Sequence, residues 1–480
     1  MRSFISAAPV CLALGACLVL GACAHVRAPD VRLPEGYEAP RGTAPIGAVE
    51  LDRWWLAFHD DQLTALIEQT LVANPDARSA AARLAEARAV RTEALVQFLP
   101  QGDIHGSTSR TDTHQLAGTV IDIPGFTTSG ISNASAANFN VSWEVDIFGR
   151  FFAARRAVDA DLAAARFDYE ATRASLAADV ADAYFLARGL AIQLDDARET
   201  ARIQGELYDT ATRRAQVGIG ARADADRVAG DLAQAKSQAA GLEAELQVQR
   251  RTLLVLAGRT IEPTENVAID ASVGVLPPIP DSLPSQILQR RPDVREAEAR
   301  VAGQAGRSDA DVLAFLPVLN FTPGIGWQKQ SQPGFSVTAQ SLVLGGNIAQ
   351  PLLSIPRLLA ELKAQNARTE QAVIAYEKAV QTAFSESEAA LVRLDSDRAR
   401  VTVLTDGEAR SARGYQAAKL GYDRGLTDLQ TTLSTEESWR NTRSQLTAAQ
   451  VQALRRTVQV YKAIGGGWPA DHFPSDKQAR

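Results

Sequence analysis

Apolar and polar residues alternate along four segments of this chain. One of them runs from 138 to 147, and its apolar positions are Phe139, Val141, Trp143, Val145 and Ile147. The polar positions between them are Asn140, Ser142, Glu144 and Asp146. A period of two predicts a β-strand with one apolar face and one polar face. The predicted strand pairs are 101–113 with 131–147, and 318–329 with 336–350.

Long helical sequence follows each strand pair, and no proline interrupts it before Pro263 or between Pro356 and Pro469. Alanines and small apolar residues recur among charged ones, which predicts narrow seams of helix contact rather than one wide apolar face. A helix of about 65 residues would be a rod of about 100 Å. The predicted helices are 61–98 with a break at Asn74-Pro75, 150–216, 224–256, 282–315, 357–423 and 428–464.

The chain contains an internal repeat. Asn74-Pro75-Asp76 recurs as Arg291-Pro292-Asp293, Phe98-Leu99-Pro100 recurs as Phe315-Leu316-Pro317, and Gly218 corresponds to Gly425. The spacing shortens after the strands, which predicts an insertion at 114–126 in the first copy. The predicted organisation is a signal peptide at 1–22, an N-terminal segment at 23–55, a first repeat at 56–259, a linker at 260–281, a second repeat at 282–466 and a C-terminal tail at 467–480.

The first 23 residues have the pattern of a secretory signal. Arg2 is followed by an apolar core too short to span a bilayer comfortably, although an N-terminal anchor helix is an alternative. Leu20-Gly21-Ala22-Cys23 resembles a bacterial lipobox, which predicts a lipid on Cys23. Ala24 at the next position resembles lipoproteins sorted to the outer membrane. The other two cysteines, Cys11 and Cys17, lie within the signal.

Four strands cannot close a barrel, which needs about eight or more. A small soluble sandwich is one alternative, but little other β sequence is available to cover the apolar faces. Several chains that pool their strands would place the apolar faces against lipid and the polar faces around a pore.

Charge and motifs exclude several functions. The net charge of −6 does not favour nucleic acid as a partner, and there is no P-loop, HExxH, G-x-S-x-G or CxxC motif. The five histidines are scattered, so we expect neither an enzyme nor a metal site. Asp-Ala-Asp at 159–161 and at 309–311 is interpreted as solvated helix surface, whereas 224–226 follows a turn and can cap a helix or line a gate.

Three motifs of this chain carry a resemblance to a known family. Residues 54–63 read WWLAFHDDQL, residues 71–76 read LVANPD, and residues 143–150 read WEVDIFGR. They resemble the "WW..F.D..L", the "AL..N.D" that follows it and the strand-to-helix junction "WE.DLFGR" of TolC-like outer-membrane efflux proteins, in the NodT/OprM-like lipoprotein branch. At the second junction the chain departs from the family, because it has Ile355-Pro356-Arg357 in place of Gly-Arg.

The resemblance implies a mainly α protein with four strands per chain, whose homotrimer forms a twelve-stranded membrane β-barrel and a periplasmic α-barrel. It implies a lipid-anchored outer-membrane protein with a long periplasmic extension. The implied partners are a periplasmic membrane-fusion adaptor, an inner-membrane pump of RND type and outer-membrane lipid. No cofactor is expected beyond the lipid on Cys23.

The sites expected from this resemblance lie around the two helical turns. Adaptor docking is expected at the tips, on Gly218, Gly220, Arg424 and Gly425. A periplasmic gate is expected from Asp224, Tyr422, Asp423 and Asp428. In the family, a tyrosine and a carboxylate at positions matching Tyr422 and Asp224 tie neighbouring hairpins together. Thr431 and Ser434 stand where some relatives carry an Asp pair, so an acidic ring would come from Asp423 or Asp428.

The function expected from the sequence is a passive exit duct that exports drugs or other small toxic compounds from a tripartite efflux pump. Two alternatives remain at this point. One is an exit channel for type I polypeptide secretion, which would share the architecture. The other is a non-porous structural or adaptor protein of the envelope.

Overall fold

A computed structural model describes residues 29–39, 50–114, 116–117, 130–281, 284–285, 290–332 and 334–469. The predicted signal peptide, Cys23, most of the predicted insertion and the end of the C-terminal tail lie outside these residues. The chain forms two compact units. The sheet unit holds Ala85–Ala164 and Glu298–Ala375, and the hairpin unit holds Asp30–Leu84, Ala165–Ala297 and the chain from Tyr376 onward. Each unit therefore takes segments from both halves of the sequence.

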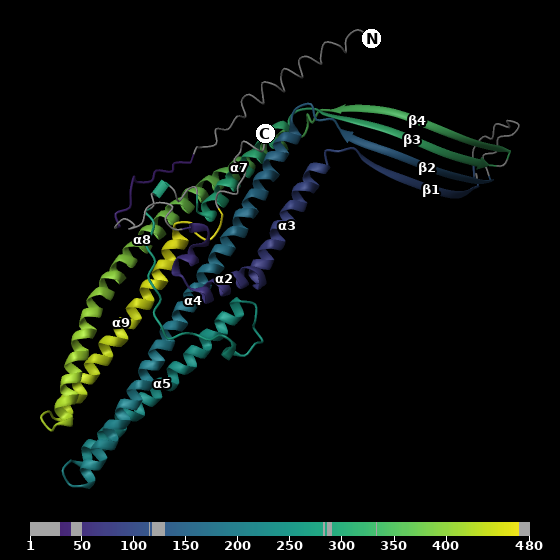
Figure 1. Ribbon diagram of the computed structural model, residues 1–480. Helices are drawn as coiled ribbons and strands as arrows, with labels where there is room; N and C mark the ends of the chain where they lie inside the picture. The colour runs from purple at the N-terminus through teal and green to yellow at the C-terminus, as the bar shows by residue number, and fades with distance from the viewer. Residues whose placement is uncertain are drawn as a thin grey trace. The chain divides into compact units, whose positions relative to one another are not determined.

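The sheet unit contains one four-stranded antiparallel sheet in the order β1-β2-β3-β4 (Figure 1). Its strands are β1 (Gln101–Thr113), β2 (Gly130–Glu144), β3 (Val318–Gln332) and β4 (Phe335–Ala349). All four were predicted, but β2 ends at Glu144, three residues before the predicted end. The alternation continues to Ile147 in the sequence, whereas Asp146 already caps the helix that follows and therefore leaves the strand pattern.

The helices match the predicted segments closely. They are η1 (Leu51–Phe58), α2 (Asp61–Ala73), α3 (Pro75–Val96), α4 (Arg150–Gln216), α5 (Arg222–Leu256), η2 (Thr264–Asn266), α7 (Pro292–Leu313), α8 (Ile355–Asp423) and α9 (Leu429–Ala463). The break at Asn74-Pro75 is confirmed, because Asn74 is extended between α2 and α3. In the second half, Pro284, Ser285 and Arg290 are helical, Arg291 interrupts the helix, and α7 begins at Pro292, so helix is found within the predicted range 282–315. Among the described residues, no helix is both long and apolar enough to cross a membrane.

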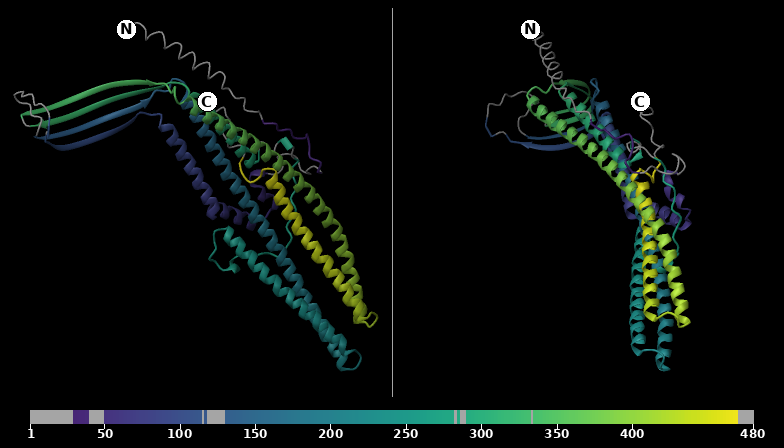
Figure 2. Two further views of the ribbon diagram at one scale, coloured as in Figure 1. Left: turned by 180° about the vertical axis from the view of Figure 1, so that it is seen from behind. Right: turned by 90° about the vertical axis from the view of Figure 1, so that its left-hand side faces the viewer.

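Two helical hairpins, α4 with α5 and α8 with α9, make up most of the hairpin unit (Figure 2). Both turn at a glycine in the left-handed region, Gly218 at φ +78° and Gly425 at φ +77°. At both turns the amide that follows the glycine reaches back to the last helical turn, from Ile219 to the Arg214 carbonyl at 3.0 Å and from Leu426 to the Gly421 carbonyl at 2.7 Å. This is the Schellman arrangement, in which a glycine avoids the penalty that a Cβ atom would incur.

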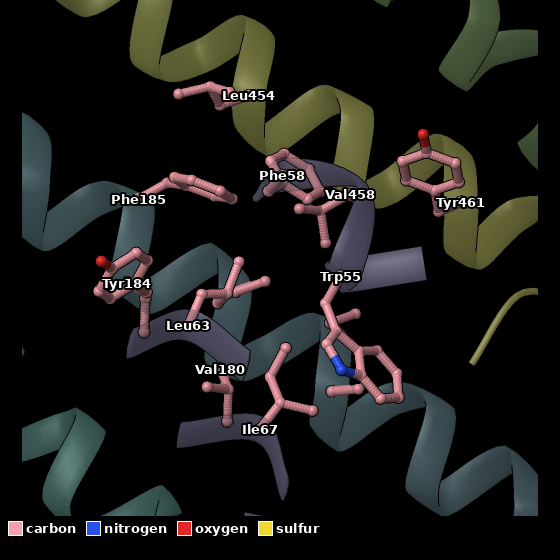
Figure 3. Close-up of a cluster of buried hydrophobic side chains, with 14 of the residues drawn as sticks. Trp55, Phe58, Leu63, Ile67, Val180, Tyr184, Phe185, Leu454, Val458 and Tyr461 are labelled. Atoms are coloured by element: carbon pink, nitrogen blue, oxygen red, sulfur yellow. The ribbon is translucent and has the colours of Figure 1, made fainter. Parts of the chain in front are cut away.

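Aromatic residues just before α2 form the centre of the hairpin unit. Trp54 and Trp55 of η1 are buried, and Phe58 packs on Phe185 of α4 with ring centroids 4.9 Å apart. Trp54 stacks on Tyr461 of α9 at 5.6 Å. Figure 3 shows side chains of η1, α4 and α9 pointing toward one another in this cluster. The sequence at 54–63 therefore supplies a core rather than a surface.

The two return helices end in matching contacts. The Asn74 side chain donates to the Leu256 carbonyl at the end of α5, at 2.9 Å, and the Arg291 side chain donates to the Ala463 carbonyl at the end of α9, at 3.3 Å. Asn74 and Arg291 are the residues that precede the repeated Pro-Asp. The repeat seen in the sequence is therefore also a repeat of tertiary contacts.

The segment predicted as a linker is packed against the hairpin unit. Val267 and Ile279 are buried in its core, and the Ser272 carbonyl accepts a hydrogen bond from Arg188 at 2.8 Å. The Tyr461 hydroxyl donates to the Pro278 carbonyl at 2.9 Å. The segment 260–281, which connects the two halves of the chain, is thus fixed along its length by contacts with the core of the hairpin unit.

Candidate functional site

One face of the sheet is apolar across all four strands. Register places Ile104 opposite Phe139, Phe139 opposite Ile325, and Ile325 opposite Leu342, so these four side chains form one row. Ile104 is 78% exposed and Leu342 is 71% exposed. Further rows toward the helices add Val141, Trp143, Leu319, Phe321, Leu344 and Ile348. An apolar surface that is continuous over four strands requires an apolar environment outside the chain.

The opposite face of the same sheet is polar. Asp103 pairs with Asn140, which pairs with Gly324, and His105 pairs with Asn138 in the next row. The alternation predicted from 138–144 therefore extends across β1, β2 and β3, whereas β4 adds the apolar Val343 to the row of Asn140 and Gly324. One face suits lipid and the other suits water.

The junction between β2 and α4 is organised by Asp146. One carboxylate oxygen accepts hydrogen bonds from the amides of Gly149 at 2.8 Å and Arg150 at 2.9 Å, and the other accepts from Phe151 at 2.8 Å. Partial burial raises the pKa of Asp146, but the backbone N–H groups outweigh it and hold the pKa below its usual value of 3.8. Asp146 thus satisfies the free amides at the start of α4.

Other residues of the junction at 143–150 connect the two halves of the chain. Gly149 adopts φ +88°, which favours glycine. The Arg150 guanidinium donates to the carbonyls of Leu313 at 3.1 Å and Leu316 at 2.9 Å, at the end of α7. At the second junction Gln350 donates to the Phe315 carbonyl at 3.0 Å. The different residues at the second junction therefore still give a helix, which begins at Ile355.

The residues expected to dock an adaptor lie at the two hairpin turns, and all four are exposed: Gly218, Gly220, Arg424 and Gly425. The turns also expose two large apolar side chains that the sequence did not single out, Ile219 at 75% and Leu426 at 81%. Each directly follows its turn glycine. The alternating apolar and glycine residues of the turns were the signal that could have identified them.

The residues expected to form a gate are in three different environments. Tyr422 is buried in a cluster with Ile203, Leu207, Val228 and Leu433, and the Arg214 guanidinium lies 4.6 Å from the centre of its ring. Asp224 and Asp423 are exposed, and no hydrogen bond within the described part of the chain joins Tyr422 to Asp224.

Asp428 caps the return helix α9, because its carboxylate accepts from the Thr431 amide at 2.7 Å. That hydrogen bond holds the pKa of Asp428 below its usual value. Asp428 is therefore the residue that caps this return helix. The cap interpretation of 224–226 is wrong for Asp224, because the N-cap of α5 is Ala221.

A buried polar cluster between the two hairpins was not predicted. Glu436 of α9 is 0% exposed, and its carboxylate accepts from the Gln204 amide of α4 at 2.8 Å. Its second oxygen lies 3.4 Å from the Arg440 guanidinium, without a hydrogen bond. Tyr415 of α8 is also buried and stacks on Trp439 at 5.2 Å, and its hydroxyl is unpartnered. The Glu436–Arg440 spacing resembles an exposed helical ion pair, so the sequence alone indicated a surface.

Burial raises the pKa of Glu436, and Asp231 adds to the increase, while Arg440 and Lys419 oppose it. Burial, followed by the charges of Glu436 and Glu206, also raises the pKa of Tyr415 to about 12. Among the residues that the structure describes, no group of three or more metal-ligating side chains is found.

Comparison with known proteins gives consistent matches over most of the chain. The sequence profile of the family described as "Outer membrane efflux protein" matches residues 66–259 and 283–466. The chain is 30% identical over 448 residues to the pyoverdine export outer membrane protein OpmQ of Pseudomonas putida, with 91% of this chain and 93% of that protein covered. It is 27% identical over 477 residues to the toluene efflux pump outer membrane protein TtgC of Pseudomonas putida, with 94% of each covered. The solved outer-membrane channel OprN is similar in structure, with a TM-score of 0.78, 27% identity, and 92% of this chain and 99% of that chain covered.

Glu436 predicts a pH dependence of stability. Because the packed structure raises its pKa above the ordinary value of 4.5, its contribution to stability is complete below that pH and is lost as the pH rises through the raised pKa. Glu436→Gln should remove this loss of stability. As the pH rises from 5 to 8, the thermal unfolding midpoint of the variant should therefore increase relative to that of the wild type. Circular dichroism of the detergent-solubilised protein measures both midpoints. Glu437→Gln removes the same charge from an exposed neighbour and should show no such trend; an equal trend in both variants would contradict the assignment.

Proposed function

Because the chain belongs to the outer membrane efflux protein family, we propose that it forms the exit duct of a tripartite efflux pump, through which small toxic compounds pass to the exterior. Family membership favours a porous channel over a non-porous envelope adaptor. The protein is an outer-membrane protein with a TolC-like fold. We propose that it acts without catalysis and without a cofactor other than a lipid.

The observation that carries this proposal is the four-stranded sheet with one apolar and one polar face. Its outer strands, β1 and β4, each pair on one side only within the chain. Three copies that join β4 of one chain to β1 of the next would close a barrel of twelve strands, with no open edge in the bilayer. The apolar rows would then face lipid, and the row of Asp103, Asn140 and Gly324 would face the lumen.

We also propose that the hairpin turns dock a periplasmic adaptor, which couples the duct to an inner-membrane pump of RND type. The exposed Ile219 and Leu426 support this, since apolar side chains at this exposure require a partner surface. The neighbouring Arg213, Arg222 and Arg424 are exposed as well, and so are Asp224 and Asp423. The partner surface should therefore be apolar at its centre and carry charges of both signs around it.

The gate is proposed to lie beside these turns. Asp224 and Asp423 are exposed there and, repeated three times, would form an acidic constriction that favours cations. Tyr422 and Asp428 would act from within the hairpin, Tyr422 through its packing under Arg214 and Asp428 as the cap of α9. In planar bilayers, the paired change Tyr422→Phe and Asp224→Ala should raise the conductance, because it removes the phenol hydroxyl and the carboxylate that would tie neighbouring hairpins of the trimer together. Unchanged conductance, with the trimer intact, would place the gate elsewhere.

Cys23 is proposed to carry the lipid anchor, which the mass of the mature protein would reveal. The nearest described segment, 29–39, packs along α8, where the Ala39 amide donates to Glu388 at 2.7 Å and Tyr37 stacks on Phe384 at 5.8 Å. Residues 30–39 are therefore held within the hairpin unit.

Cysteine labelling tests the barrel. Phe139→Cys and Trp143→Cys should react with a lipid-soluble probe, whereas Asn138→Cys and Asn140→Cys should react with a hydrophilic maleimide. The reason is that these two pairs lie on opposite faces of β2. The wild-type protein is the blank for any reaction at native cysteines. Reversed parity, or equal labelling of both faces by both probes, would refute the barrel.

Serine substitution tests the docking turns. The double change Ile219→Ser and Leu426→Ser should lower cross-linking to the adaptor and drug export by about tenfold or more, because two apolar contacts are lost in each protomer. Neither residue has a left-handed backbone, so the turns should fold normally. Ile261→Ser, on an equally exposed apolar residue away from the turns, is the matched control. Full export by the double variant, with the trimer intact, would exclude docking through these side chains.

A further inference from the structure

The only arginine and lysine in the four strands are Arg110 of β1 and Lys329 of β3. Both are exposed. Register places both on the apolar face, because Lys329 follows Ile325 and Trp327 in steps of two, and Arg110 follows Ile104 in steps of two. The acidic residues Asp103 and Glu144 lie on the opposite face. The third acidic residue of the strands, Asp112, lies on the same face as Arg110, two residues further along β1. The apolar face therefore carries both cations and one carboxylate.

Both cations lie just beyond one border of the apolar band. The band extends along β3 from Leu319 to Trp327, a rise of about 27 Å, which is close to the height of about 25 Å that membrane barrels present to lipid. Lys329 is the next position on that face after Trp327, and Arg110 lies one row further. This border is on the side of the strand-connecting loops, away from the helices. It therefore corresponds to the outer leaflet in a protein whose helices lie in the periplasm.

The surroundings of the two cations suit an anion. Lys329 shares its row with Ser135, Thr108 and Thr338. The hydroxyls of Thr108 and Ser135 lie 3.2 Å apart, which places them side by side on this face. Among the described residues, neither Arg110 nor Lys329 forms an ion pair, and the nearby Asp112 is paired with His114 at 3.4 Å. Both cations are thus available to a ligand, with hydroxyl donors beside Lys329.

Closure of the barrel would turn two cations into a ring. Because β1 and β3 alternate with β2 and β4, every second strand of a barrel of three chains carries one cation on its outward face. Neighbouring strands are about 4.8 Å apart, so neighbouring cations would be separated by about 10 Å along the circumference. The spacing would be the same within a chain and across the contact between chains. This step rests on the proposed trimeric barrel.

We propose that Arg110 and Lys329 form a cationic ring that binds the phosphate groups of lipids in the outer leaflet. An arginine binds phosphate through two parallel hydrogen bonds, and a lysine contributes a point charge. The continuity of the two cations with the apolar band identifies the ligand as a lipid, since acyl chains would cover Ile325 and Leu342 while the phosphates reach the ring. The bound lipids would form a shell that fixes the depth of the barrel in the membrane.

Native mass spectrometry of the full-length trimer tests this inference. The trimer is extracted from vesicles of phosphatidylcholine that contain bisphosphorylated lipid A, or lipid A from which the phosphates were removed. The wild type should retain at least about tenfold more of the phosphorylated lipid than the double variant Arg110→Gln and Lys329→Gln. The double variant Arg78→Gln and Lys236→Gln removes the same charge from exposed sites in the hairpin unit and should bind like the wild type.

Three results would overturn the proposal. They are equal retention by the strand variant and the wild type, equal retention of the dephosphorylated lipid, and full displacement of the lipid by millimolar inorganic phosphate, which would indicate a site for free phosphate. Conductance in planar bilayers separates this proposal from the proposed function. The strand variant should conduct like the wild type, whereas a wild-type protein that forms no trimer and no pore would contradict the duct itself.

Discussion

An open sheet edge cannot be left in hydrocarbon, and this constraint governs the rest of the structure. Each backbone N–H or C=O group without a partner costs several kcal/mol there. The strand order β1-β2-β3-β4 leaves both the first and the last strand with one unpaired side. A single chain therefore cannot stand alone in a membrane. Its exposed apolar rows also lack an apolar surface to contact within the chain. Association of copies would pair the open strand edges, and the surrounding lipid would then cover the apolar rows.

The same constraint makes the ends of the strands important, because each chain must leave the bilayer twice by an ordered route. Asp146 satisfies the amides that begin α4, and Arg150 satisfies carbonyls at the end of α7, so few backbone groups at this exit lack a partner. The second exit reaches a similar result with Gln350. The duplicated halves thus solve one problem with different side chains, as they also do with Asn74 and Arg291.

The contact between the two hairpins is of another kind. Arg455 of α9 pairs with Asp182 of α4 through two hydrogen bonds of 2.8 Å, Arg443 pairs with Asp196, and Gln204 binds Glu436. The two ion pairs are partly exposed, so solvent screens their attraction, and these contacts specify alignment more than they add stability. The unpartnered atoms around Glu436 and Tyr415 show that this interface is not optimised for tightness. A polar interface of this kind would suit the hairpin movement that the proposed gate requires.

The sequence by itself determined the strands, the helices, the two turns and the repeat. These depend on local periodicity and on glycine and proline positions, which act within a few residues. It also indicated the two faces of the sheet, because the alternation within Asn138–Glu144 carries over to the paired strands β1 and β3.

Only the tertiary structure decided which side chains are buried and what they meet. Trp54 and Trp55 form a core, Asp146 leaves its strand to cap a helix, and Glu436 lies inside although its spacing to Arg440 indicates a surface. Register alone brought Arg110 and Lys329 to the same face. In each case the partner is distant in sequence, and the energy of burying a polar or aromatic group depends on that partner rather than on the residue's own neighbours.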